Sequence, residues 1–123
     1  MKITTFDPII CTKDAASAIA LFEALGFERS HRNDNVPDRE SVISVRMKNE
    51  NGYHVDVVQS DKLERDLMTI RINVDNFDEA YEFFTAHGFT PNSEKPSAAS
   101  YAKFIGMTAP SGFQISLAQH IRK

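Results

Sequence analysis

The sequence predicts an α+β fold built from two βαβββ modules in tandem, and three observations predict it. The chain has 123 residues, a length typical of one compact domain. Residues 51–59 match residues 111–119 in the pattern Gly-aromatic-x-aliphatic-x-aliphatic-x-Gln. Each copy is preceded by a helix-like segment that ends in Gly-Phe. We therefore expect a single domain over residues 1–123, with one module at 3–60 and the other at 67–120.

Each module is expected to begin with a strand and a helix. β-Branched residues predict first strands at 5–12 and 69–74. Apolar residues at helical spacing predict helices at 15–25 and 77–87. Asp14 is the expected N-cap of the first helix, and Gly26 and Gly88 are expected to terminate the helices.

Three further strands complete each predicted module. The second strands start at Phe27 and Phe89, directly after the helices. The third and fourth strands flank residues 49–52 and 109–112, whose Gly, Asn and Pro residues are typical of hairpin loops. Loops are expected at 33–40 and 93–100, and a solvated linker at 60–66.

Alternation along the strands separates a helix-facing side from a second, polar side. The apolar sets of the fourth strands, which should pack on the helices, are Tyr53, Val55 and Val57 in one module and Phe113, Ile115 and Leu117 in the other. The second side carries the candidate ligand-binding or catalytic residues, which are Asp7, Cys11, Ser44, Arg46, His54, Asp56, Arg71, Asn73, Phe104, Gln114 and Ser116. Such a side either faces water or lines a pocket.

Composition excludes several classes of partner. The net charge is −3 with both signs interspersed, so neither nucleic acid nor a membrane is an expected partner. The first residues show no signal-peptide pattern, which favours a cytoplasmic protein. The single cysteine, Cys11, excludes an internal disulfide and is either a small buried side chain or a nucleophile.

Two segments resemble signatures of the vicinal oxygen chelate superfamily, which includes glyoxalase I, extradiol dioxygenases and bleomycin resistance proteins. Residues 14–27 read DAASAIALFEALGF, similar to the family's opening signature that ends in L-G-F. Residues 109–117 read APSGFQISL, similar to its closing D-P-x-G-N-x-I-E-L. The resemblance implies curved mixed sheets that form a cup with the helices outside, and a homodimer.

The resemblance also implies where metal-dependent members hold their metal, on the first and fourth strands of each module. Those positions are Asp7 and Asp56 in the first module and Thr69 and Ser116 in the second. Hydroxyls are poor primary ligands for a catalytic divalent metal, so we expect no metal or other cofactor. A non-standard site of Asp7, His54 and Asp56 is the alternative.

The leading functional hypothesis is a glyoxalase/bleomycin resistance-like protein that binds a small molecule in a cup-shaped pocket without a metal. The alternative is a lyase, isomerase or dioxygenase, either metal-dependent through Asp7, His54 and Asp56 or using His54 and Asp56 as an acid-base pair. A third hypothesis, a module for protein partners, requires the polar side to be filled by the protein's own side chains. Two roles stay open for Arg46 and Arg71, which bind an anionic ligand or pair with carboxylates. Phe104 stacks on a planar ligand or belongs to the core.

Overall fold

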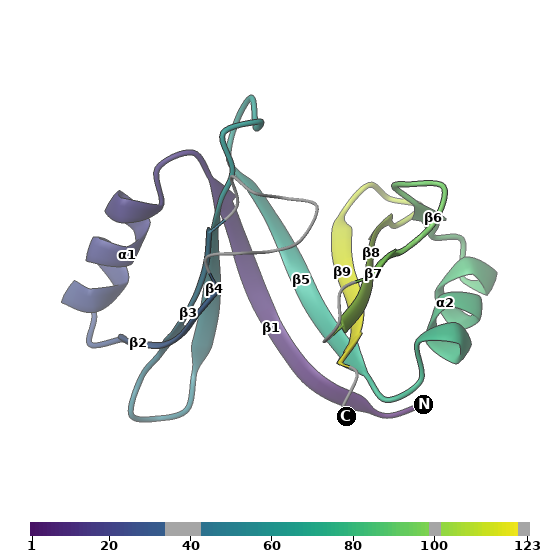
Figure 1. Ribbon diagram of the computed structural model, residues 1–123, viewed down its shortest axis with the longest axis horizontal. Helices are drawn as coiled ribbons and strands as arrows, with labels where there is room; N and C mark the ends of the chain where they lie inside the picture. Colours follow the sequence, from purple (N-terminus) through teal and green to yellow (C-terminus); the bar gives the residue numbers. More distant parts are fainter. Residues whose placement is uncertain (34–42, 99–101, 121–123) are drawn as a thin grey trace. The chain divides into compact units, whose positions relative to one another are not determined.

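The computed structural model describes residues 1–33, 43–98 and 102–120 (Figure 1). Contacts between residues divide the chain into two compact units. One unit comprises Asp7–Met68, and the other comprises Thr69–Lys123 together with Met1–Phe6. The predicted loop at 33–40 lies almost entirely outside the described residues.

The first module has the predicted order of strand, helix and three strands. Its elements are β1 (Ile3–Thr12), α1 (Ala15–Ala24), β2 (Glu28–Asn33), β3 (Ile43–Lys48) and β4 (His54–Gln59). The strand order is β2-β3-β4-β1. Pairing is antiparallel except between β1 and β4, which are parallel.

The second module repeats this plan with a shorter second strand. Its elements are β5 (Leu67–Val74), α2 (Phe77–Ala86), β6 (Thr90–Pro91), β7 (Ser97–Ala98), β8 (Ala102–Thr108) and β9 (Gln114–His120). β5 pairs with β9 in parallel, and β8 pairs antiparallel with β9, β6 and β7. The segment predicted as a loop at 93–100 thus contains β7, a pairing of two residues that is too short to leave an alternating pattern in the sequence.

Matching side chains hold the first turn of each helix. The Asp14 carboxylate accepts hydrogen bonds from the Ser17 hydroxyl at 2.6 Å and the Ser17 amide at 3.1 Å, and these bonds lower the pKa of Asp14. The Asn76 side chain accepts from the Glu79 amide in the same way. Asp14 is therefore the N-cap that the sequence predicts, and Asn76 is its counterpart on α2.

The two glutamines of the sequence repeat have the same structural role. Gln59 Oε1 accepts from the Ala15 amide at 3.2 Å, and Gln119 Oε1 accepts from the Phe77 amide at 2.6 Å. Each bond joins the last part of the fourth strand to the first residue of the module's helix, whose amide has no partner within the helix. The repeated Gln thus ties helix to sheet in both modules.

The helices end at the two predicted glycines. Gly26 and Gly88 have φ of 98° and 89°, a left-handed conformation that other residues adopt at a cost. After α1, the Phe27 amide donates to the Phe22 carbonyl at 2.9 Å, and the two rings make an edge contact with centroids 5.5 Å apart. Phe89 and Phe84 repeat both contacts after α2. No helix of the described residues is long and apolar enough to cross a membrane.

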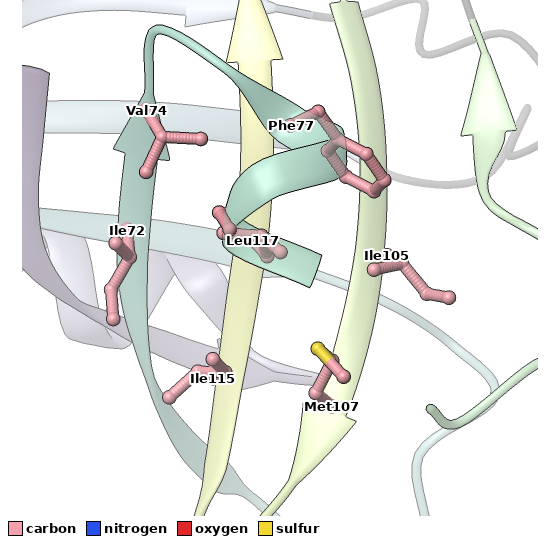
Figure 2. Packing of buried hydrophobic residues seen from close by; sticks show 8 residues of the cluster. Ile72, Val74, Phe77, Ile105, Met107, Ile115 and Leu117 are labelled. Atoms are coloured by element: carbon pink, nitrogen blue, oxygen red, sulfur yellow. The ribbon is translucent and has the colours of Figure 1, made fainter. Parts of the chain in front are cut away.

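Each module has its own apolar core between helix and sheet. In the second module, alternate residues of three strands pack with Phe77 of α2, and Figure 2 shows the strand residues Ile72, Val74, Ile105, Met107, Ile115 and Leu117. In the first module, the core consists of Ala15, Ile19, Val45, Met47, Val55 and Val57. These sets confirm the predicted alternation of β3, β4, β5 and β9.

Tyr53 does not pack on a helix, so that prediction is wrong. Its side chain is 68% exposed, and its backbone closes the β3–β4 turn by bonding to Asn49. Phe113, its counterpart in the repeat, is also exposed at 54%, although its ring contacts the edge of Phe89. Both aromatics belong to the turn, where alternation no longer fixes the direction of a side chain.

The start of the chain packs with residues that follow β5. The Lys2 amide donates to the Asp75 carboxylate at 2.6 Å, and the Asp75 amide donates to the Lys2 carbonyl at 3.1 Å. β1 therefore contributes its first residues to one module and the rest to the other.

Candidate functional site

The polar side of the first module is fixed by strand register. Asp56 of β4 lies between Ile9 of β1 and Arg46 of β3. Val58, two residues further, lies between Cys11 and Ser44. Because paired residues point to the same side of a sheet, these positions share the side opposite α1, as the sequence predicts.

A buried acidic pair and one arginine dominate this side. Asp7 and Asp56 are each only 2% exposed. Arg46 Nε donates to Asp56 Oδ1 at 3.0 Å. This hydrogen bond raises the pKa of Arg46, burial opposes the rise, and the charges of Asp56 and Asp7 add to it. The two buried carboxylates therefore both stabilise the positive charge of Arg46.

The structure also places the residues of the predicted metal and acid-base sites. His54 is at the start of β4, half-buried and opposite Lys48. Asp56 forms an ion pair with Arg46. Among residues 1–33, 43–98 and 102–120, no three His, Cys, Asp or Glu side chains are grouped so that they could hold a metal. The structure thus brings Arg46, Asp7 and Asp56 together and does not assemble Asp7, His54 and Asp56 as a ligand set.

The polar side of the second module is built by the same register but from other residues. Ser116 of β9 lies between Arg71 of β5 and Gly106 of β8. Ala118, two residues further, lies between Asn73 and Phe104. Gln114 pairs with Thr108 at the end of the hairpin. All five predicted residues of this module therefore share one side of its sheet.

Asn73 is the most unusual of these residues. It is 2% exposed, and its Oδ1 has no hydrogen-bond partner among the described residues. A buried oxygen without a donor costs about 1–3 kcal/mol, so such groups are rare unless a water or a ligand bonds to them. Asn73 is therefore the strongest single indication of a binding position in this module.

Asn92 is a contributor that the sequence did not indicate. Its Oδ1 accepts from the Thr108 hydroxyl at 2.6 Å, and its backbone N–H donates to the Gly106 carbonyl at 2.9 Å. The Asn92 Nδ2 lies 2.9 Å from where a Cβ at Gly106 would be, so only glycine fits there without a shift. A lone Asn in a loop carries no periodic signal, and only the fold reveals this contact.

A surface depression of about 650 Å³ lies elsewhere, between the end of α1 and the β3–β4 turn. Its lining includes Gly26, Arg29, Lys48 and Glu50. None of the predicted site residues lines it, and we assign it no role.

Comparisons with solved structures show the same fold in methylmalonyl-CoA epimerases. The enzyme from Mycobacterium tuberculosis superposes with a TM-score of 0.72 at 14% identity, over 98% of this chain and 90% of that chain. The Streptomyces coelicolor enzyme in complex with 2-nitronate-propionyl-CoA gives 0.69 at 15%, over 98% and 100%. A hypothetical protein from Bacillus halodurans gives 0.72 at 11%, over 97% and 96%.

Sequence comparison adds no relative: no protein-family model and no curated protein matches the chain. At identities of 11–15%, structural similarity establishes the fold but does not identify the reaction. The duplicated βαβββ order, the helix ends and the agreement over nearly the whole chain show that the protein has the glyoxalase/bleomycin resistance-like fold of these neighbours.

Proposed function

We propose that the protein binds a small molecule without a metal ion, and that the Arg46 guanidinium stands where metal-dependent members of the superfamily hold their metal. The observation that carries this proposal is the ion pair between Arg46 and Asp56. By the family resemblance, Asp56 is at a metal-ligand position. Its carboxylate already has a cation, supplied by the next strand at 3.0 Å.

A divalent ion at this position would face two costs. It would have to separate a carboxylate that is 3% exposed from its arginine, which leaves a buried charge pair broken. It would also lie beside the guanidinium, whose positive charge repels it at short range. In the second module, Thr69 and Ser116 offer only hydroxyls. The residues present therefore do not fit a catalytic metal.

The alternative functions of the superfamily make a different demand on Asp56. A metal-dependent or acid-base lyase, isomerase or dioxygenase needs its carboxylate as ligand or as partner of His54. Arg46 donates to one oxygen of that carboxylate. A protein that only binds a ligand can keep Asp56 paired with Arg46, so the geometry favours binding. A cup-shaped pocket, a homodimer and a cytoplasmic location belong to this proposal through the resemblance and the composition.

Ligand-observed NMR on chelator-treated protein tests the proposal. The library would contain small carboxylic acids, phenols and methylmalonyl-CoA, the last because one structural neighbour is a complex with it. We expect at least one ligand whose Kd is the same with and without EDTA, and unchanged by added Ni²⁺. Ligand binding that disappears with EDTA and returns with a metal would refute the proposal.

A further inference from the structure

The β3–β4 turn of the first module contains Asn51, the only asparagine of the sequence that precedes a glycine. This turn has the same hydrogen bonds as the β8–β9 turn of the second module. The Gly52 amide donates to the Asn49 carbonyl at 3.1 Å, and the Gly112 amide makes the equivalent bond at 2.9 Å. Ser111 takes the place of Asn51 in the second turn. The repeat thus provides one turn with a side-chain amide before its glycine and one without.

The side chain of Asn51 is exposed to solvent. Its backbone amide donates to Asn49 Oδ1 at 3.1 Å, but its side chain makes no hydrogen bond to the residues that the structure describes. Among the other asparagines, Asn49, Asn76 and Asn92 each accept a hydrogen bond through the side chain, and Asn73 is buried. The Asn51 amide is therefore free to turn towards its own main chain.

Gly52 makes the backbone nitrogen next to this amide accessible. Its φ is 87°, and a Cβ built there would meet nothing within 4 Å, so the surrounding space is open. Glycine also has no Cβ of its own to shield the nitrogen. The hydrogen bond to the Asn49 carbonyl lies in an exposed turn, where backbone hydrogen bonds open at a low free-energy cost.

We propose that Asn51 is a site of spontaneous deamidation, a covalent modification that requires only water. The Gly52 nitrogen loses its proton to water and bonds to Asn51 Cγ, the Cγ–Nδ2 bond breaks, and ammonia leaves. Water then opens the resulting succinimide ring at either of its carbonyl carbons. One product is an aspartate. The other is an isoaspartate, in which the main chain runs through Cγ.

The two products differ in their effect on the first module. Aspartate adds a negative charge beside Glu50 in an exposed turn, where charges contribute little to stability. Isoaspartate adds a methylene group to the main chain between Asn49 and Tyr53, whose backbone groups bond across the turn at 3.0 Å. Isoaspartate therefore loosens the β3–β4 hairpin, whose register places Arg46 opposite Asp56.

Peptide mapping of the folded, full-length protein after incubation at mildly alkaline pH tests the proposal. We expect the mass gain of an exchange of NH₂ for OH, assigned to Asn51 by fragment masses. An isoaspartate-specific carboxyl methyltransferase should label part of the product. The rate should be about twofold to tenfold lower than in the chain unfolded by guanidinium chloride, the effect of one backbone hydrogen bond.

Asn51→Ser is the matched control, because Ser111 occupies the same position in the second turn. The variant should fold with an unchanged Tm and show no modification at this position. Incubation should lower the Tm of the wild-type protein as isoaspartate accumulates, but not that of the variant. Modification at Asn49 or Asn92 before Asn51 would overturn the proposal. So would modification of Asn51 in guanidinium chloride with none in the folded protein.

Discussion

Replacing Arg46 with methionine is expected to lower the free energy of unfolding by about 3 kcal/mol, the lower end for breaking a buried ion pair. The lower end applies because the Arg46 side chain is 32% exposed, whereas Asp56 is only 3% exposed. Methionine retains an apolar stem and removes the charge, so Asp56 loses its cation while it stays buried. Urea denaturation at neutral pH measures the loss.

A matched arginine provides the control for this variant. Arg29 pairs with Glu23 at 3.5 Å, with both side chains about half exposed. Arg29→Met should therefore change stability by about 0.5 kcal/mol or less. Combining Arg46→Met with Asp56→Leu should recover only part of the loss, because Asp7 remains buried nearby. Equal effects of Arg46→Met and Arg29→Met would contradict the account of the buried cluster.

Gly88→Ala is expected to destabilise the protein by about 3 kcal/mol, from two independent causes. The φ of 89° costs about 1–2 kcal/mol for a residue with a Cβ. A Cβ there would also lie 2.7 Å from Pro110 Cγ, an overlap that a rigid ring relieves only by moving.

Gly26→Ala isolates the backbone cause. Gly26 has φ of 98° and ends α1 in the same motif, but a Cβ there would meet nothing within 4 Å. We expect a loss of about 1–2 kcal/mol, that of the left-handed conformation alone. Thermal or urea unfolding of the two variants checks the difference, and equal losses would show that Pro110 yields without cost.

Much of the fold follows from patterns that the sequence displays directly. The repeat around Gln59 and Gln119 predicts two copies of one module. Each glutamine makes the same hydrogen bond from the fourth strand to the first residue of the helix, so the contact requires the same residue in both copies. Strand alternation predicts the cores because register is strict where one side is buried. Tyr53 shows where this reasoning ends, since alternation is lost at the turn.

The candidate site was predictable as a set of positions, but not as a set of partners. Alternation places Arg46, His54 and Asp56 on one side, and the structure agrees. Which cation bonds to Asp56 depends on neighbouring strands, because His54 lies along the same strand while Arg46 lies directly across. The identity of this partner distinguishes an ion pair from an acid-base pair. Predicting it requires the register of β3 against β4.

The central claim is that an arginine takes the place of the metal, and a calorimetric titration of chelator-stripped protein tests it most directly. Wild-type protein and the Asp56→Ala variant would be titrated with Ni²⁺, Zn²⁺ and Mn²⁺. We predict no stoichiometric binding to either protein, because Arg46 neutralises Asp56 in the wild type and the variant lacks this carboxylate. Tight binding of one ion per chain that Asp56→Ala abolishes would contradict the claim and restore a metal-dependent reaction.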